Sequence, residues 1–414
     1  MILKLIGINF SYKIFQIIIR IISLLVVSRL VIPEDFGKFV IFNSFLIIVF
    51  SFSVGSIRYL VIRQEVKQIY YSEVISVALI NTTLGLILIL PLMFGLNTNI
   101  SLIDLIVIYI SIILCSLFYV FSILNEALME IKGKFVELQK KTTICILIFE
   151  VIVPIILLKV GFNFWSLIVG KILSVIFYLY FIRLEVFFNF NKLNVSKVKD
   201  FLKSSYHILL SESINNLSSN IDNILISQYM GNKNLGLYSR SYNLIKIPAE
   251  TIGVILNKIT YVKKMERMIN NFYSSVLAFI ILMLVSFVFY FYADYIFIKL
   301  LGGNWAEIGS YIKVACWGMY VRLLLKINEN EIKKISNKIL VIGSQLVYLV
   351  LIIFGISIGL FYNDVLLIIL LLIGAMTLQV VWTSCFLFKK KEIFFILTST
   401  IIMWFLSLLT WSNL

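Results

Sequence analysis

The sequence predicts an all-α protein that crosses a lipid bilayer about 12 or 13 times. Of its 414 residues, 61% are hydrophobic and only 14% are charged, whereas soluble domains are about 45–50% apolar and about 25% charged. The mean hydropathy is +1.02, so the chain carries more apolar surface than one water-soluble core could bury. Its apolar stretches approach the roughly 20 residues that a helix needs to span lipid.

Apolar windows mark the predicted helices in order along the chain. They cover residues 14–32, 39–57, 74–94, 103–124, 143–158, 162–182, 205–230, 237–257, 272–298, 308–327, 339–361, 364–388 and 393–411. The tenth window is the most polar, because Lys313, Arg322 and Lys326 lie in it or at its end. All links are short, which leaves no room for an enzymatic domain outside the membrane.

The longest link divides the chain into two similar parts. We predict an N-terminal lobe of six helices at 1–190, a basic cytoplasmic link at 191–204, a C-terminal lobe of six helices at 205–388 and an extra C-terminal helix at 389–414. Segments 33–39 and 232–238 both read as a polar turn, an apolar residue, Gly, one residue and an aromatic. Parallel six-helix repeats would give this echo, as in many transporters; the alternative is that turns favour Gly in any protein.

The net charge of +15 follows the predicted topology. Cytoplasmic links of membrane proteins collect Lys and Arg, and with a cytoplasmic N-terminus most of the 36 basic residues fall inside. The outside segments then hold only Arg29, Lys38, Lys159, Lys233 and Lys299. We therefore expect the N-terminus in the cytoplasm and no nucleic-acid partner.

Ionisable side chains within the predicted spans are the functional candidates, because a charge near the bilayer centre costs about 2.5–3.5 kcal/mol. Cations facing a central cavity would suit an anionic cargo, since guanidinium groups pair well with phosphate oxygens. The candidate cationic residues are Arg20, Arg29, Arg58, Lys171, Arg240 and Lys246. The carboxylates that could take up H⁺ or Na⁺ for coupling are Glu150, Glu212, Asp222 and Glu250.

Each of these candidates also has a structural interpretation. Lys246 and Glu250 are four residues apart and could form an ion pair on one helix. Arg58 lies near a helix end, where a basic side chain can reach the interface. The polar seventh span, with nine Ser, Asn and Asp residues between 211 and 223, would line a wet cavity or form hydrogen bonds between helices.

Enzyme motifs are missing from the sequence. No GxxxxGK[ST] occurs, which excludes ATP hydrolysis by this chain. One histidine, His207, and no GxSxG motif leave nucleophilic hydrolysis without its usual residues. Four dispersed cysteines form no metal-ligand pattern, so we expect no metal and no cofactor.

Four stretches resemble bacterial polysaccharide-export flippases of the MOP superfamily, which include the Wzx-type O-antigen flippases. They are 19–37, with Arg20, Arg29 and Pro33-Glu34-Asp35-Phe36-Gly37; 161–170; 220–248, with Asn220-Ile221-Asp222-Asn223; and 302–306, Gly-Gly-Asn-Trp-Ala. Arg20, Arg29 and Asp222 occupy positions of these motifs. The chain departs from the pattern in the short link after the eighth span and in its thirteenth span.

The resemblance implies a MATE-like fold, with two six-helix lobes around a central cavity. It implies transfer of undecaprenyl-diphosphate-linked oligosaccharide across the bacterial inner membrane, driven by a H⁺ or Na⁺ gradient. The expected partners are this glycan, membrane lipid, and an O-antigen polymerase with its chain-length regulator.

Three rival functions remain open at the level of sequence. A multidrug or organic-cation antiporter of the same superfamily would prefer a cavity dominated by carboxylates. An O-antigen polymerase or ligase would have a large outer loop, which is missing here. A scaffold for the assembly machinery would keep its function when cavity charges are removed.

Overall fold

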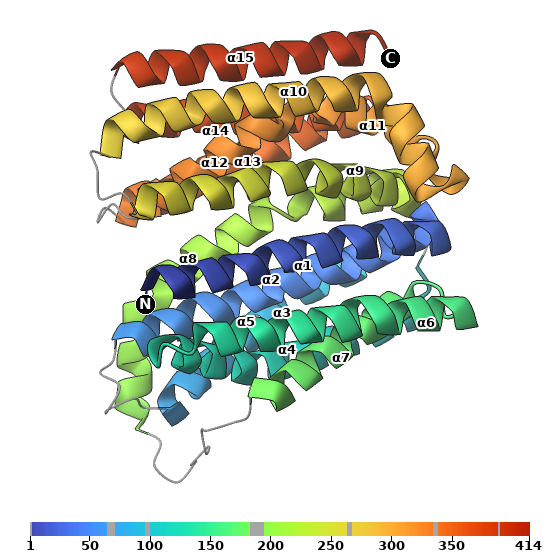
Figure 1. Ribbon diagram of the computed structural model, residues 1–414. Coiled ribbons are helices and arrows are strands. Elements are labelled where there is room, and N and C mark those ends of the chain that lie inside the picture. The colour runs from blue at the N-terminus through green and yellow to red at the C-terminus, as the bar shows by residue number, and fades with distance from the viewer. Residues whose placement is uncertain are drawn as a thin grey trace. The chain divides into compact units, whose positions relative to one another are not determined.

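The computed structural model describes residues 2–63, 71–95, 100–182, 194–262, 267–333, 338–387 and 390–414 (Figure 1). These residues form helices joined by short turns, and none of them lies in a β-strand. The prediction of an all-α polytopic protein is confirmed. The chain divides into two compact units, Met1–Asn220 and Ile221–Leu414.

The first unit contains eight α-helices and one π-helical segment. They are α1 (Ile2–Leu30), α2 (Pro33–Arg63), α3 (Tyr71–Phe94), α4 (Leu102–Ile131), α5 (Phe135–Cys145), η2 (Ile146–Ile152), α6 (Val153–Val160), α7 (Trp165–Ile182) and α8 (Val195–Ser218). The segments α5, η2 and α6 follow one another without a break and together make the predicted fifth span. Pro33 is the first residue of α2, a position where a proline's missing N–H has no cost. Ser101 caps α4, and its hydroxyl accepts a hydrogen bond from the N–H of Asp104 in the first turn.

The core of the first unit lies between α2, α3 and α4. Fully buried Ile57, Val74 and Val120 represent these three helices in one apolar cluster. Val198 and Phe201 from the N-terminal half of α8 pack against this cluster. The start of α8, which the sequence analysis places in the link 191–204, is therefore fixed to the first unit by ordinary apolar packing.

The second unit contains seven α-helices and a short 3₁₀ turn. They are α9 (Ile221–Val262), α10 (Arg267–Leu301), η4 (Gly303–Trp305), α11 (Ile308–Ala315), α12 (Gly318–Lys333), α13 (Lys338–Phe361), α14 (Val365–Leu387) and α15 (Lys390–Ser412). Helix α14 is the centre of this unit, because it packs against α11, α12, α13 and α15. Its residues Ile368, Leu372 and Val380 are buried.

Helix α9 consists of two legs that reverse direction at Gly231. Gly231 has φ 85° and ψ 168°, a conformation that only glycine adopts readily. The Tyr238 hydroxyl donates a hydrogen bond to Asp222, 16 residues earlier, although a straight helix would separate the two by about 24 Å. The predicted seventh span thus consists of α8 and the first leg, interrupted at Ser219–Asn220, and the predicted eighth is the second leg.

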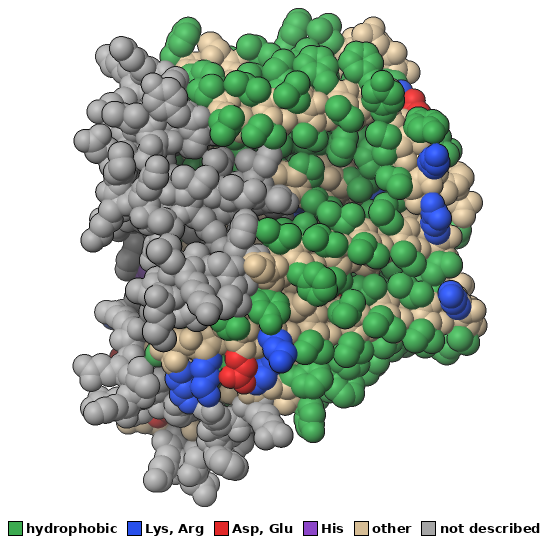
Figure 2. All heavy atoms as spheres, in the orientation of Figure 1, with side chains coloured by type: hydrophobic (Ala, Val, Ile, Leu, Met, Phe, Trp, Pro, Cys, Tyr) green, Lys and Arg blue, Asp and Glu red, His purple; other side chains and the backbone are tan. Residues whose placement is uncertain are grey.

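Nine of the helices in the described parts of the chain are long and apolar enough to cross a membrane. The other predicted spans, at 14–32, 205–230, 237–257 and 308–327, correspond to α1, α8, α9 and the α11–α12 pair. Hydrophobic side chains cover most of the described surface in Figure 2. This surface suits a lipid environment, because lipid replaces water as the solvent.

The two units do not divide the chain where the sequence divides it. The boundary follows Asn220, so α8 groups with the first unit, whereas the sequence places the division at 191–204. Apolar contacts of α8 with α2 and α3 explain the grouping. The division into lobes at 1–190 and 205–388 with an extra helix at 389–414 stays a prediction.

Candidate functional site

The first cluster of charged residues forms around Glu150, on the π-helical segment η2. A proline has no N–H, and its ring clashes with the carbonyl four residues earlier in an α-helix. Pro154, at the start of α6, therefore cannot continue an α-helical ladder to the carbonyl of Glu150. The helix widens instead, and the N–H of Val153 bonds to the carbonyl of Ile148, five residues back. Such π-helical turns are frequent at functional sites.

Gly170 brings α7 into direct contact with this widened turn. A Cβ atom at position 170 would lie 2.5 Å from Cγ of Pro154 and 2.6 Å from the carbonyl oxygen of Phe149. Only glycine therefore allows the two backbones to approach so closely. The next residue, Lys171, is held beside Glu150 as a result.

Lys171 and Glu150 form an ion pair within the first unit. The Lys171 Nζ atom lies 2.8 Å from Glu150 Oε1, and the Ser174 hydroxyl donates to the same oxygen at 3.2 Å. Arg20 of α1, an exposed residue, interacts electrostatically with Glu150. One turn before Arg20, Gln16 donates to Thr143 Oγ1 of α5 at 2.9 Å. Three predicted site residues, Arg20, Glu150 and Lys171, are thus brought together on α1, η2 and α7.

The second cluster lies in the second unit, around Asp222 in the first turn of α9. The carboxylate accepts hydrogen bonds from the Tyr238 hydroxyl and from the N–H of Asn223. The Tyr238 ring stacks on that of Tyr242, with 5.9 Å between centroids. The guanidinium group of Arg322 on α12 donates to the Tyr242 hydroxyl and lies 4.7 Å from the centroid of its ring. Asp222 and Arg322 are therefore connected through two tyrosines.

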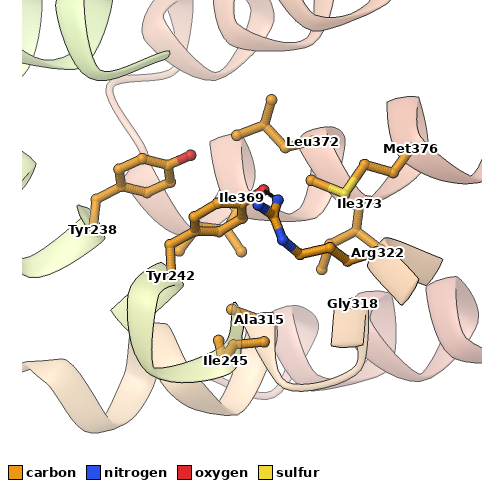
Figure 3. A pocket seen from close by; sticks show the side chains of 10 residues that line it. All are labelled: Tyr238, Tyr242, Ile245, Ala315, Gly318, Arg322, Ile369, Leu372, Ile373 and Met376. Atoms are coloured by element: carbon orange, nitrogen blue, oxygen red, sulfur yellow. Dashed lines mark hydrogen bonds between the residues drawn. The ribbon is translucent and has the colours of Figure 1, made fainter. Parts of the chain in front are cut away.

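A small pocket opens beside these tyrosines, as Figure 3 shows. It has a volume of about 330 Å³. The Arg322 side chain points toward Tyr242 from the opposite wall, and apolar side chains of α9, α11 and α14 complete the lining. The tyrosine ring and the charge of Asp222 both stabilise the guanidinium group in these surroundings.

The other predicted cationic residues are dispersed. Arg240 is buried with its guanidinium 5.4 Å from the Trp305 ring centroid, so it holds α9 against η4 by a cation–π contact. Arg29 is exposed in the last turn of α1, where the helix dipole stabilises a positive charge. Lys246 is half-buried on α9. The side chain of Arg58 lies outside the described residues.

The remaining predicted carboxylates also lie apart from the two clusters. Glu212 is half-buried on α8. The side chain of Glu250 lies outside the described residues, so its ion pair with Lys246 stays a prediction. Within the described parts of the chain, no group of three or more His, Cys, Asp or Glu side chains could hold a metal ion.

Sequence reasoning missed four residues of these clusters, namely Ser174, Tyr238, Tyr242 and Arg322. The i, i+4 spacing of the two tyrosines places them on one helix face, and both belong to a motif that the sequence singles out. The sequence places Arg322 in the tenth window or at its end. The structure places it within α12, which continues to Lys333, and beside Tyr242.

Comparisons with known proteins agree with this architecture. The sequence profile of the polysaccharide biosynthesis protein family matches residues 26–310. The teichuronic acid biosynthesis protein TuaB of Bacillus subtilis (strain 168) is 35% identical over 63 residues, which are 15% of this chain and 13% of that protein. The matched part thus spans only a small fraction of this relative.

A solved structure shares the fold of almost the whole chain. It is an inward-facing conformation of a multidrug resistance MATE family transporter of the MOP superfamily, with a TM-score of 0.53 and 14% sequence identity, and the match covers 91% of this chain and 97% of that one. Together these findings bear out the resemblance in family and in fold, and the nine apolar helices of the described residues indicate a multi-pass membrane protein. The chain therefore belongs to the polysaccharide biosynthesis protein family.

Proposed function

We propose that this protein is a flippase that moves an undecaprenyl-diphosphate-linked oligosaccharide, such as an O-antigen or capsule repeat unit, across the bacterial inner membrane. Transport would proceed by alternating access and would be coupled to an ion gradient. The family, which concerns polysaccharide biosynthesis, supports a glycan cargo. The MATE transporter fold supports a transporter and not an enzyme.

The cluster of Arg20, Glu150 and Lys171 is the observation that carries this proposal. It combines two cations with one carboxylate among apolar helices, where unneeded charges are costly. Glu150 pairs with Lys171 at 2.8 Å. A diphosphate group could replace Glu150 as the partner of Lys171 and engage the exposed Arg20, because charge-assisted bonds to phosphate are strong.

The driving ion is part of the proposal. We infer that H⁺ or Na⁺ enters at one of the carboxylates Glu150, Glu212, Asp222 or Glu250, since ionisable groups within membrane spans commonly serve as ion relays. The N-terminus would lie in the cytoplasm, and the translocated glycan would pass to an O-antigen polymerase with its chain-length regulator.

A flipping assay tests this function directly. The full-length protein would be reconstituted into liposomes with a labelled undecaprenyl-diphosphate oligosaccharide, and its appearance in the opposite leaflet would be timed. Lys171→Gln and Arg20→Gln should each slow the transfer at least about tenfold, which corresponds to about 1.4 kcal/mol of lost stabilisation. Lys233→Gln is the control, because Lys233 belongs to the second unit and lies 58% exposed beside Glu307.

Equal transfer by all of these proteins would contradict the cationic site. An organic-cation antiporter is the alternative, favoured by the fold shared with a multidrug transporter. The cations of the Arg20–Lys171 cluster would repel such a cargo. Export of a fluorescent organic cation, together with no transfer of the glycan lipid, would therefore replace the flippase proposal with the antiporter.

A further inference from the structure

We propose that Asp222, Tyr238, Tyr242 and Arg322 form a proton-binding site in the second unit, and that this site takes up H⁺ and not Na⁺. Its use in transport rests on the proposed function, whereas the binding of the proton does not. The site lies on the two legs of α9 and on α12. None of its residues belongs to the cluster around Glu150.

The geometry connects a buried carboxylate to a cation through two aromatic hydroxyl groups. Asp222 is 7% exposed and Tyr238 is 1% exposed. The Tyr238 hydroxyl donates to Oδ2 of Asp222, and the N–H of Asn223 donates to Oδ1 at 2.9 Å. At the other end, Arg322 donates to the Tyr242 hydroxyl. Arg322 also acts electrostatically on Asp222.

These surroundings accommodate both protonation states of Asp222. The two donors and the positive charge of Arg322 stabilise the carboxylate, whereas burial among apolar side chains stabilises the neutral acid. In the charged state, Asp222 and Arg322 together have no net charge. When a proton binds to a carboxylate oxygen, the site gains a net positive charge, and the Tyr238 hydroxyl can then accept a hydrogen bond from the acid.

The same groups disfavour a sodium ion. A metal cation needs several oxygen ligands whose lone pairs face it. Both oxygens of Asp222 are instead approached by donor hydrogens, from Tyr238 and Asn223. The guanidinium of Arg322 adds a repulsive charge. A proton needs only one lone pair of the carboxylate, so the donor hydrogens do not exclude it. The charge of Arg322 lowers the affinity for either cation, and the number of available lone pairs is what favours H⁺ over Na⁺.

Charged and titratable groups on the neighbouring helices define what else acts on the site. Helix α12 contributes Arg322 and the ion pair of Lys326 with Glu329 at 2.8 Å, and α13 contributes Tyr348, which interacts electrostatically with Asp222, Arg322 and Glu329. On α9 itself, the buried Arg240 lies against the Trp305 ring. On α11, Lys313 pairs with Asp294 of α10 at 2.5 Å. The buried side chains of α14 are apolar or neutral. Arg322 is thus the cation that balances Asp222 in the described part of this unit.

Infrared difference spectroscopy of the full-length protein in lipid nanodiscs tests the proposal. Acidification should produce the carbonyl band of a protonated carboxylic acid. Asp222→Asn should lack this component, Asp222→Glu should restore it, and the exposed control Glu307→Gln should keep it. Addition of Na⁺ at constant pH should leave the band unchanged. A band in Asp222→Asn that is identical to that of the wild type, or an Asp222-dependent loss of the band on adding Na⁺, would overturn the proton site.

Substitution of Arg322 provides a second measurement, which does not require the Asp222→Asn variant to fold. In Arg322→Gln the carboxylate loses a nearby positive charge, so it should hold its proton about tenfold more tightly. Lys233→Gln removes an exposed cation from α9, the helix that carries Asp222. It should leave the proton affinity of Asp222 unchanged. Identical proton affinities for Arg322→Gln and the wild type would contradict the assigned role of Arg322.

Neither measurement requires transport, so the proton site and the flippase proposal can fail separately. In the flipping assay, a pH gradient should accelerate transfer by the wild type but not by Asp222→Asn, whereas a Na⁺ gradient should accelerate neither. An Asp222-dependent response to the Na⁺ gradient would overturn the assignment of H⁺. Absence of any glycan transfer, with an intact infrared titration, would contradict only the proposed function.

Discussion

Glycine and proline decide where the charges of the first unit meet. Pro154 prevents the α-helical bond to the carbonyl of Glu150, and η2 widens there. Gly170 then lets α7 approach, because a Cβ would lie within 2.6 Å of Pro154 Cγ and Phe149 O. The ion pair of Lys171 and Glu150 thus depends on two residues that carry no charge.

Gly170→Ala should therefore lower the stability of the protein. The added methyl must push α7 away from η2, and overpacking of this kind costs about 1–3 kcal/mol. Thermal unfolding in detergent would show a lower midpoint than the wild type. Gly343→Ala is the matched control, since a Cβ there meets nothing within 4 Å and alanine favours a helix. Equal midpoints for both variants would contradict the close approach.

Interrupted helices give the second unit its polar contacts. The α11–α12 pair breaks at Cys316 and Trp317, and Ser286 of α10 donates to the carbonyl of Cys316 at 2.8 Å. The Trp317 indole donates to Thr410 Oγ1 of α15 at 2.9 Å. An interrupted helix exposes backbone and side-chain groups that must find partners within the protein, because lipid offers none.

Thr410→Val should weaken the attachment of α15. The substitution keeps the shape of the side chain but leaves the buried Trp317 N–H without its acceptor, which should cost about 1 kcal/mol. Denaturant or thermal unfolding would measure the loss. Thr398→Val on the same helix should change stability little, because Thr398 bonds only to carbonyls of its own helix. Equal stability of Thr410→Val and Thr398→Val would contradict a stabilising role of the hydrogen bond from Trp317 to Thr410.

The topology of the whole chain brings alternate links to the same end of each unit. The Nζ atom of Lys38, at the end of the first predicted outer link, lies 5.6 Å from the ring centroid of Phe164. Phe164 comes just after the third predicted outer link. In the second unit, Lys233 pairs with Glu307 at 2.7 Å, which joins the turn of α9 to the link after α10. These contacts agree with the alternation that the basic residues predict.

The orientation in the membrane is the corresponding whole-molecule prediction. With the exposed Cys385 replaced by Ser, Lys233→Cys should react with a membrane-impermeant maleimide on intact spheroplasts. Lys199→Cys, in the predicted cytoplasmic link, should react only after permeabilisation. This pattern follows from the positive-inside rule. The reverse pattern would place the N-terminus outside.

Much of this architecture could be predicted from the sequence. The hydropathy windows anticipate the helices because each crossing must satisfy its backbone internally and present apolar side chains to lipid. Arg20, Glu150 and Lys171 could be singled out by the cost of a charge within a span. Their pairing could not, since it depends on the π-helical turn and on the approach at Gly170.

Composition and the distribution of charge by themselves determined that the protein is a helical membrane protein with short links, because these properties report the solvent of each segment. Only the tertiary structure decided that α8 groups with the first unit, that α9 reverses at Gly231 and that Arg322 meets Tyr242. The physical reason is that lipid exposure acts on each residue separately, whereas a polar site needs the positions of several helices at once.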